Sequence, residues 1–163
     1  IPTQAIFPQG QQFVEIRCGS VFTIARDTSG NVWAWGTNDH GVLGRTDVTG
    51  SATPLESLMP AGRTYTSIGT GWGHSCGIDQ LGYSWCWGYN SHGALGDGTH
   101  TTSGTPTQVL TPPTEFQQLD GGNGFSCGID TSGHAWCWGY GDTAALGNGS
   151  TIEYTYPVQV VEP

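Results

Sequence analysis

A single pattern recurs three times along the chain and covers almost all of its 163 residues. Its most visible mark is a Trp-Gly pair that ends at Gly36, Gly88 and Gly139, so the copies are 52 and 51 residues apart. Other positions keep their distance from this pair, among them an aliphatic residue and a glycine before it and a Leu-Gly pair and two prolines after it. A fixed period of this length is typical of repeat proteins in which every copy is one supersecondary unit.

Each copy consists of short runs bounded by Gly, Pro, Asn and Thr, and none contains a helical window longer than a turn or two. Such runs predict strands and an all-β fold. A further proline element precedes the first full copy, and nothing is left over for a second domain. We therefore predict one domain over 1–163, with an extra proline strand element and three repeats that cover 1–8, 9–60, 61–112 and 113–163.

The clearest local element is a central hairpin in each repeat. In the second repeat its turn is Asp79-Gln80-Leu81-Gly82, in which glycine supplies the left-handed conformation of a three-residue loop. Centring the hairpin on Leu81 pairs Cys76 with Cys86, and the same count pairs Cys127 with Cys137. Directly opposed Cβ atoms are about 4.5–5.5 Å apart, close to the disulfide range of about 3.5–4.5 Å. We predict both disulfide bonds.

Two segments match the G-x-S-x-G pattern of a serine-hydrolase nucleophile: G-H-S-C-G at 73–77 and G-F-S-C-G at 124–128. That nucleophile requires a helix directly after the serine, whereas both segments continue into a turn and a tryptophan-rich strand. The hairpin register places Ser75 opposite Trp87 and Ser126 opposite Trp138. We interpret the serines as small residues that make space for indole rings, and we predict no catalytic residue and no enzyme.

Composition excludes several function classes. The chain has four Arg, no Lys and a net charge of −9, so it lacks the clustered cations that nucleic-acid phosphates require. Paired cysteines predict an oxidising compartment, and we expect an extracellular or cell-surface protein, with the periplasm also open. No signal peptide or membrane span is evident, so we expect a mature, trimmed or partial chain.

Three smaller features receive their own interpretation. Cys18 has no partner within its repeat, so we expect it to be free and buried, with an inter-blade or intermolecular bridge as the alternative. Asn148-Gly149-Ser150 is a glycosylation sequon if the source modifies asparagine. The histidines lack metal-ligand spacing, so we predict no metal and no cofactor and expect His74 to be a core residue. They are His40, His74, His92, His100 and His134.

The repeat resembles that of the regulator of chromosome condensation family. In the second copy the resemblance is carried by Ile68, Gly71, His74, Ile78, Gly82, Trp87-Gly88-Tyr89-Asn90, Gly93, Leu95-Gly96 and Pro106. The disulfide-bearing, tryptophan-rich version is similar to bacterial secreted members such as the propeller β-lactamase inhibitor proteins. The resemblance implies a β-propeller with one four-stranded blade of about 51 residues per repeat, and usually seven blades in the family. Phe22, Phe125 and Ala144 depart from the pattern.

Three blades cannot close a ring, since propellers have typically four to eight. We expect two exposed, tryptophan-rich blade flanks that further blades or subunits must cover. Two explanations remain open. The chain is a segment of a larger propeller, which we favour, or two copies associate into a closed ring of six blades.

For function we expect an exported module that binds another protein, because propeller loops gather at the rims of a stiff disc. The resemblance implies that two loop sets line the binding rim, one before the second strand and one after the Trp-Gly pair. Aromatic, Asn and Asp side chains in these loops suit protein contacts. The candidate partner-binding residues are Val21, Asn38, Asp39, Trp72, Tyr89, Asn90, Asn123, Tyr140 and Asp142.

Two alternatives compete with this expectation. A structural cell-surface or filament subunit would assemble with identical copies through its blade flanks. A lectin-like propeller would bind sugars on tryptophan platforms, but six of the seven tryptophans fall inside predicted strands and only Trp72 lies in a loop.

Overall fold

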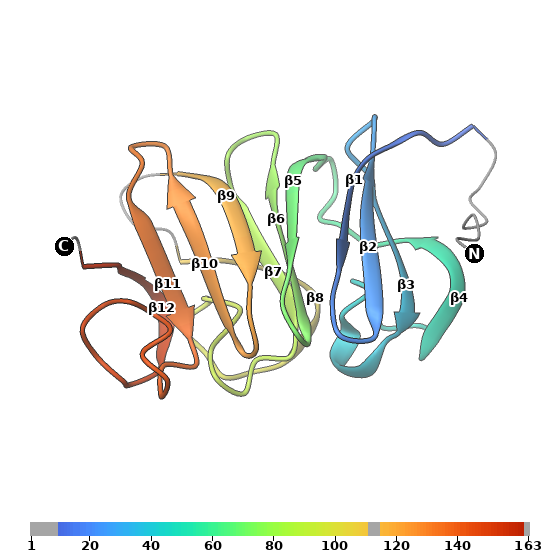
Figure 1. Ribbon diagram of the computed structural model, residues 1–163. Coiled ribbons are helices and arrows are strands. Elements are labelled where there is room, and N and C mark those ends of the chain that lie inside the picture. Colours follow the sequence, from blue (N-terminus) through green and yellow to red (C-terminus); the bar gives the residue numbers. More distant parts are fainter. Residues whose placement is uncertain (1–9, 111–114, 162–163) are drawn as a thin grey trace, which may run out of the picture.

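The computed structural model describes residues 10–110 and 115–161 as three four-stranded antiparallel sheets that stand side by side in chain order (Figure 1). Blade 1 comprises β1 (Phe13–Cys18), β2 (Phe22–Asp27), β3 (Val32–Thr37) and β4 (Gly50–Glu56), with a short 3-10 turn, η1 (Asp39–Gly41), after β3. Blade 2 comprises β5 (Tyr65–Thr70), β6 (His74–Asp79), β7 (Ser84–Gly88) and β8 (Ser103–Gln108). Blade 3 comprises β9 (Phe116–Gly121), β10 (Phe125–Asp130), β11 (Ala135–Gly139) and β12 (Tyr154–Gln159).

In every blade the strands pair in chain order, and the first strands of successive blades contact one another. The Thr70 hydroxyl of β5, for example, donates to the Cys18 carbonyl of β1 at 3.1 Å. The predicted all-β architecture of propeller blades is confirmed. The repeat boundaries stay a prediction, because 1–9, which contains the expected proline element, and 111–114 lie outside the described residues.

The central hairpins have the predicted register. Cys76 lies opposite Cys86 and Cys127 opposite Cys137, and both predicted disulfide bonds are formed, with Cα atoms 4.1 Å apart in each. The turn glycines all have positive φ values, which explains why glycine stands there in each repeat. They are Gly30, Gly82 and Gly133, with φ of 85°, 82° and 90°.

A buried aspartate fixes each hairpin, a role that the sequence interpretation missed. Asp79 accepts hydrogen bonds from the backbone N–H groups of Leu81 and Tyr83 and from the Trp85 indole. Asp27 and Asp130 do the same in the other blades. Burial alone would raise the pKa of Asp27, but the hydrogen bonds it accepts outweigh burial and lower that pKa.

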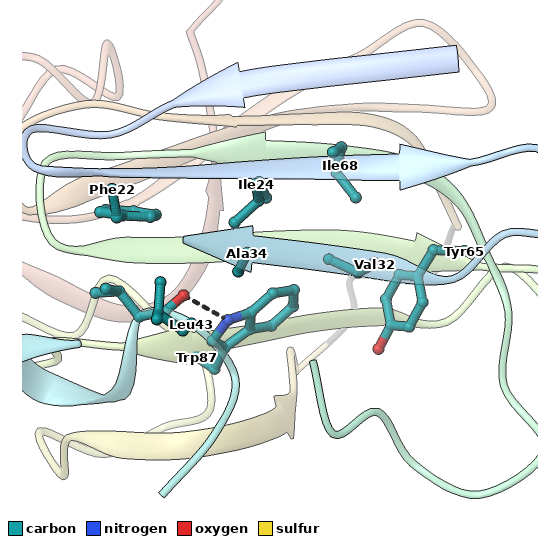
Figure 2. Packing of buried hydrophobic residues seen from close by; sticks show 9 residues of the cluster. Phe22, Ile24, Val32, Ala34, Leu43, Tyr65, Ile68 and Trp87 are labelled. Carbon is teal, nitrogen blue, oxygen red and sulfur yellow. Dashed lines mark hydrogen bonds between the residues drawn. The ribbon is translucent and has the colours of Figure 1, made fainter. Parts of the chain in front are cut away.

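Adjacent blades are joined by apolar packing around one indole. Between blades 1 and 2, Trp87 packs among residues that include Phe22, Ile24, Leu43 and Ile68 (Figure 2). Its Nε1–H donates to the Val42 carbonyl at 2.9 Å (Figure 2), and the Ser75 hydroxyl donates to the same oxygen at 3.0 Å. The indole therefore combines burial with a directed bond to the preceding blade.

The junction between blades 2 and 3 repeats this arrangement. Trp138 Nε1–H and the Ser126 hydroxyl both donate to the Ala94 carbonyl, at 2.9 and 2.8 Å. The interpretation of Ser75 and Ser126 as small residues opposite indoles is correct but incomplete, because both hydroxyls also bind the neighbouring blade. Both serines are also fully buried, so their hydroxyls do not reach solvent.

The two outer flanks differ from each other, which corrects one expectation. Since Trp87 and Trp138 both point toward the preceding blade, only the blade 1 flank is tryptophan-rich; blade 3 instead presents Cys127 and Ile129. Both flanks are open. Ile16 of blade 1 is 55% exposed, whereas its counterparts Ile68 and Leu119 are 1% and 3% exposed. Cys18, at the blade 1 end, is free as expected but exposed, not buried.

These flanks lead to a prediction about association. The isolated chain is expected to self-associate, because Ile16 and Ile129 are exposed apolar side chains. The corresponding residues of blade 2 are buried against blades 1 and 3. Replacing both residues with lysine should shift light-scattering mass toward the monomer. Leu81→Lys, at an exposed hairpin tip, is the control and should leave the mass unchanged. A monodisperse wild-type monomer would contradict the prediction.

Candidate functional site

The two predicted loop sets lie at the same end of the sheets, because β1, β5 and β9 run toward that end and β3, β7 and β11 return to it (Figure 1). We call this surface the loop rim. It consists of residues 19–21, 38–49, 71–73, 89–102, 122–124 and 140–153. The hairpin turns, with their buried aspartates, lie at the opposite end.

Two hollows of the loop rim lie at corresponding positions of the two blade junctions; a further hollow, lined by residues that include Arg45 and Thr102, lies between the long loops of blades 1 and 2. The first hollow, between blades 1 and 2, encloses about 260 Å³ and is lined by Ser20, Val21, Phe22, Thr37, Asp39, His40, Val42, Trp72 and Gly73. The second hollow, between blades 2 and 3, encloses about 280 Å³ and is lined by Trp72, Gly73, His74, Tyr89, His92, Asn123, Gly124 and Tyr140. Trp72, which is 51% exposed, forms a wall of both.

Histidine–tyrosine ring contacts cross both junctions. His40 of blade 1 contacts Tyr89 of blade 2 in a tilted arrangement with ring centroids 4.6 Å apart, and His92 of blade 2 contacts Tyr140 of blade 3 in the same way at 4.8 Å. Trp72 meets Tyr89 edge to face, with centroids 6.4 Å apart. Because both histidines stand four residues after a Trp-Gly pair, these ring contacts are a repeated feature. The sequence interpretation omitted them, although the repeat alignment carried this signal.

The structure brings most of the candidate residues together. Trp72, Tyr89, Asn123 and Tyr140 line the second hollow, and Val21 and Asp39 line the first. Asp142 is exposed and lies near the Tyr140 hydroxyl. The negative charge of Asp142 is the main cause that raises the pKa of the Tyr140 hydroxyl. These contacts place the candidates on one surface, whereas their binding of a partner stays a prediction.

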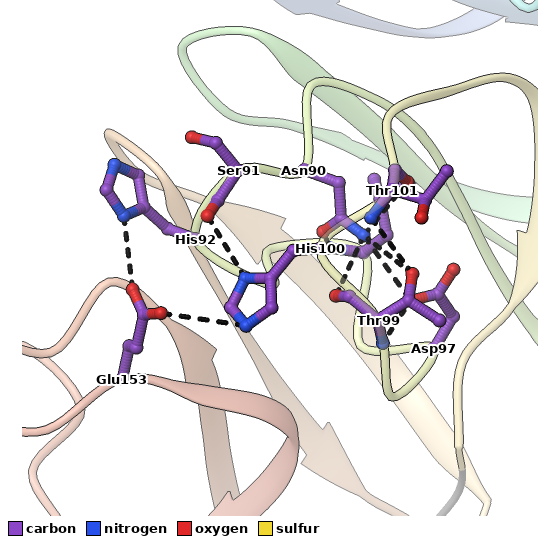
Figure 3. A network of polar contacts seen from close by, with 9 residues as sticks. Asn90, Ser91, His92, Asp97, Thr99, His100, Thr101 and Glu153 are labelled. Carbon is purple, nitrogen blue, oxygen red and sulfur yellow. Dashed lines mark hydrogen bonds and ion pairs between the residues drawn. The ribbon is translucent and has the colours of Figure 1, made fainter.

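Asn38 and Asn90 do not belong to the exposed surface, and their assignment as contact residues is wrong. The Asn90 side chain is buried and closes its own loop: it accepts from the Leu95 N–H at 2.9 Å and donates to the Thr99 and Thr101 carbonyls at 3.1 Å each (Figure 3). Asn38 anchors the blade 1 loop in the same way. Their amides are used internally, so they shape the loop rim without facing a partner.

Glu153 adds a polar bridge beside the second hollow. Its carboxylate lies 3.1 Å from His92 Nδ1 and 3.7 Å from His100 Nε2 (Figure 3). His100 Nδ1 lies 3.0 Å from the Ser91 carbonyl, which fixes the ring at the base of the bridge. Glu153 ends the last loop of blade 3, directly before β12, and both histidines belong to blade 2, so the bridge joins the two blades at the rim. Sequence spacing gave no signal for this contact.

His74 forms the floor of the second hollow and makes a serine–histidine contact that requires interpretation. Its Nε2 lies 2.8 Å from the Ser126 Oγ, and both side chains are buried. Because Ser126 gives its only proton to the Ala94 carbonyl, His74 Nε2 must carry a proton and donate it. The histidine is therefore a donor rather than a general base for the serine. The expectation of a satisfied core histidine is confirmed.

Burial lowers the pKa of His74 to about 4, below the value of 6.5 for a free side chain. Between these pH values the unfolded chain takes up a proton that the folded chain does not, so the free energy of unfolding falls as the pH falls through this window. The loss approaches about 3 kcal/mol near pH 4, since one pKa unit corresponds to about 1.4 kcal/mol. Urea denaturation at several pH values measures it.

The matched variant is His74→Phe, because Phe22 and Phe125 occupy the corresponding positions of blades 1 and 3. This variant should lose the His74 component of the pH dependence between 6.5 and 4 and keep the remainder. Equal slopes for the wild type and the variant in that window would show that His74 is not held neutral.

Consecutive four-stranded antiparallel sheets that pack flank against flank define this chain as a β-propeller repeat protein. Family models described as the regulator of chromosome condensation (RCC1) repeat match residues 29–78, 82–129 and 132–163 and, for a second model of that description, 13–42 and 65–94. These matches cover well over half of the chain. The chain belongs to the RCC1 repeat family.

Individual relatives support the same assignment. The chain is 31% identical over 147 residues to the RCC1 domain-containing protein RUG3, mitochondrial, of Arabidopsis thaliana, and the match covers 89% of this chain and 33% of that protein. It is 24% identical over 158 residues to the Arabidopsis thaliana ultraviolet-B receptor UVR8, covering 96% and 36%. The chain therefore spans about a third of the length of these relatives.

Solved structures agree on the fold. Human WBSCR16 superposes with a TM-score of 0.84 at 19% identity, over 95% of this chain and 41% of that one. Yeast RCC1 (Prp20), in a structure with Kap60, gives a TM-score of 0.79 at 22% identity, over 92% and 37%.

Two further findings bound the chemistry. Within 10–110 and 115–161, no three His, Cys, Asp or Glu side chains gather in a way that could hold a metal ion. Nor does that part of the chain include a helix with the length and hydropathy needed to cross a membrane. The two disulfide bonds themselves indicate an oxidising compartment.

Proposed function

We propose that this chain is a non-catalytic, exported binding module whose loop rim contacts a protein partner. The observation that carries the proposal is the pair of hollows on one rim, built from the same repeat positions and sharing the exposed Trp72. Tryptophan and tyrosine dominate binding energy at protein interfaces when a partner desolvates them. Here they stand on a rigid scaffold, so binding orders few side chains.

Relatives of the fold favour a protein partner. Yeast RCC1 (Prp20) is known in a structure in which it is bound to Kap60, and Prp20p of Saccharomyces cerevisiae has binding properties toward Gsp1p and histones. We carry over only the class of activity, namely recognition of other proteins by a propeller. The partner of this chain is expected in a different compartment from the partners of Prp20, because the disulfide bonds of this chain favour a location outside the reducing cytosol.

A non-catalytic role is supported by the surroundings of the serines in the two G-x-S-x-G segments. Ser75 and Ser126 are fully buried, and each hydroxyl is committed to a carbonyl of the preceding blade. One relative, the human E3 ubiquitin-protein ligase HERC2, is an enzyme by name, but this chain matches only 3% of that protein. That similarity therefore supports the presence of the repeat in this chain and gives no reason to assign it ligase activity.

Site-directed photo-crosslinking tests the proposal. A benzophenone amino acid at Asn123, exposed at the second hollow, should crosslink a discrete protein under conditions in which the same probe at Leu81, on the opposite end, does not. Trp72→Ala and Tyr89→Ala should reduce that crosslink at least about tenfold, as expected for interface anchors. The exposed Tyr83→Ala is the matched control and should leave it unchanged.

Equal labelling from both ends, or a rim crosslink that survives Trp72→Ala and Tyr89→Ala, would contradict the proposal. Circular dichroism of each variant must match the wild type, so that a lost crosslink reports on the surface and not on unfolding.

A further inference from the structure

Every arginine of the chain is already engaged by one of its own carboxylates. The chain has four arginines, no lysine and thirteen acidic residues. The ion pairs are Arg17–Glu15 at 2.8 Å, Arg26–Glu15 at 3.0 Å, Arg45–Asp47 at 2.6 Å and Arg63–Asp79 at 2.9 Å. The charge left for a partner is therefore negative.

At the loop rim this negative charge lies beside the aromatic rings. Asp39 lines the first hollow. Beside the second hollow, Asp142 lies near Tyr140, and the Glu153 carboxylate lies 3.1 Å from His92 Nδ1. Among the residues that the structure describes, no arginine lines either hollow. Arg45, which lies in the loop rim, is held by two hydrogen bonds to Asp47 and one to the Glu56 carbonyl.

The opposite end of the same protein shows how such a group of side chains holds a cation. The Arg63 guanidinium lies over the Tyr83 ring at 5.1 Å and the Trp85 ring at 5.9 Å, and it pairs with Asp79. Ring faces attract cations, most strongly when water is excluded, and a carboxylate adds a charge-assisted hydrogen bond. The first hollow contains an indole ring and the Asp39 carboxylate. The second contains three aromatic rings, from Trp72, Tyr89 and Tyr140, and its carboxylates, Asp142 and Glu153, lie beside it next to Tyr140 and His92.

We propose that the hollows of the loop rim accept arginine or lysine side chains from a basic segment of the partner protein. This inference rests on the proposed function and specifies which side chains of the partner the loop rim recognises. In the second hollow the cation lies among Trp72, Tyr89 and Tyr140 with Asp142 as counter-charge. In the first hollow Asp39 supplies the counter-charge. Because the hollows adjoin through Trp72, one extended segment with two basic residues occupies both.

Titration with short peptides tests the inference. The probes are a peptide in which arginine alternates with glycine, its lysine counterpart, its glutamate counterpart and a neutral oligosaccharide. Calorimetry measures affinity, and the indole N–H resonance of Trp72 reports the site. The arginine and lysine peptides should bind and shift that resonance, and their affinity should fall as salt is added. The glutamate peptide and the sugar should not bind.

Charge-neutral variants provide the sharper measurement. Asp142→Asn and Asp39→Asn should each lower the affinity for the arginine peptide about fivefold, as expected for the loss of one partly exposed ion pair. Tyr140→Phe, which keeps the ring, should bind more tightly than Tyr140→Ala. Glu115→Gln is the control, since Glu115 is an exposed acid whose carboxylate lies beside Gly82 in the hairpin turn at the opposite end. It should leave the affinity unchanged.

Several results would overturn the inference: equal affinity for the glutamate peptide, a Trp72 shift produced by the oligosaccharide instead, or no effect of either aspartate variant. If the crosslink from Asn123 is specific while basic peptides leave Trp72 unperturbed, the cation chemistry is wrong and the protein-binding rim stands. If both experiments fail, the rim is not the binding surface.

Discussion

Each blade junction is built around one buried indole that donates a hydrogen bond to a carbonyl oxygen of the preceding blade. Trp87 binds the Val42 oxygen and Trp138 binds the Ala94 oxygen. Each bond lies within an apolar cluster, where an unpaired indole N–H or carbonyl would cost about 1–3 kcal/mol. A serine hydroxyl shares each oxygen. Apolar burial supplies most of the free energy of packing, and these bonds set the relative position of the blades.

The same contact also creates the candidate site. Val42 and Ala94 belong to the loops that follow β3 and β7, and these loops carry His40 and His92 to the next blade's tyrosine. Asn38 and Asn90 hold the loops closed from within. The hollows are therefore a consequence of how one blade docks on another. A rim formed in this way is preorganised, which reduces the ordering that a partner must impose.

Local features could be predicted from the sequence, whereas most contacts between repeats could not. Counting along one hairpin predicted the Cys76–Cys86 and Cys127–Cys137 pairs, because opposed residues in an antiparallel ladder follow from the turn alone. The roles of Asn90 and of the flanks depend on what lies beside the blade. An asparagine at a rim position indicates a binding residue until its amide is found bonded to Leu95 and Thr99. Likewise, the common direction of Trp87 and Trp138 becomes visible only with the carbonyl oxygens that they bind.

Exchange of indole protons with solvent deuterium tests most directly whether these bonds join the blades. Trp87 and Trp138 are fully buried and bonded across blade junctions, whereas Trp72 is exposed at the loop rim. We predict that the Nε1 protons of Trp87 and Trp138 exchange only through global unfolding, with the protection of the core strands, while that of Trp72 exchanges at once. Rapid exchange at Trp87 or Trp138 under native conditions would show that the blades are not joined through these bonds.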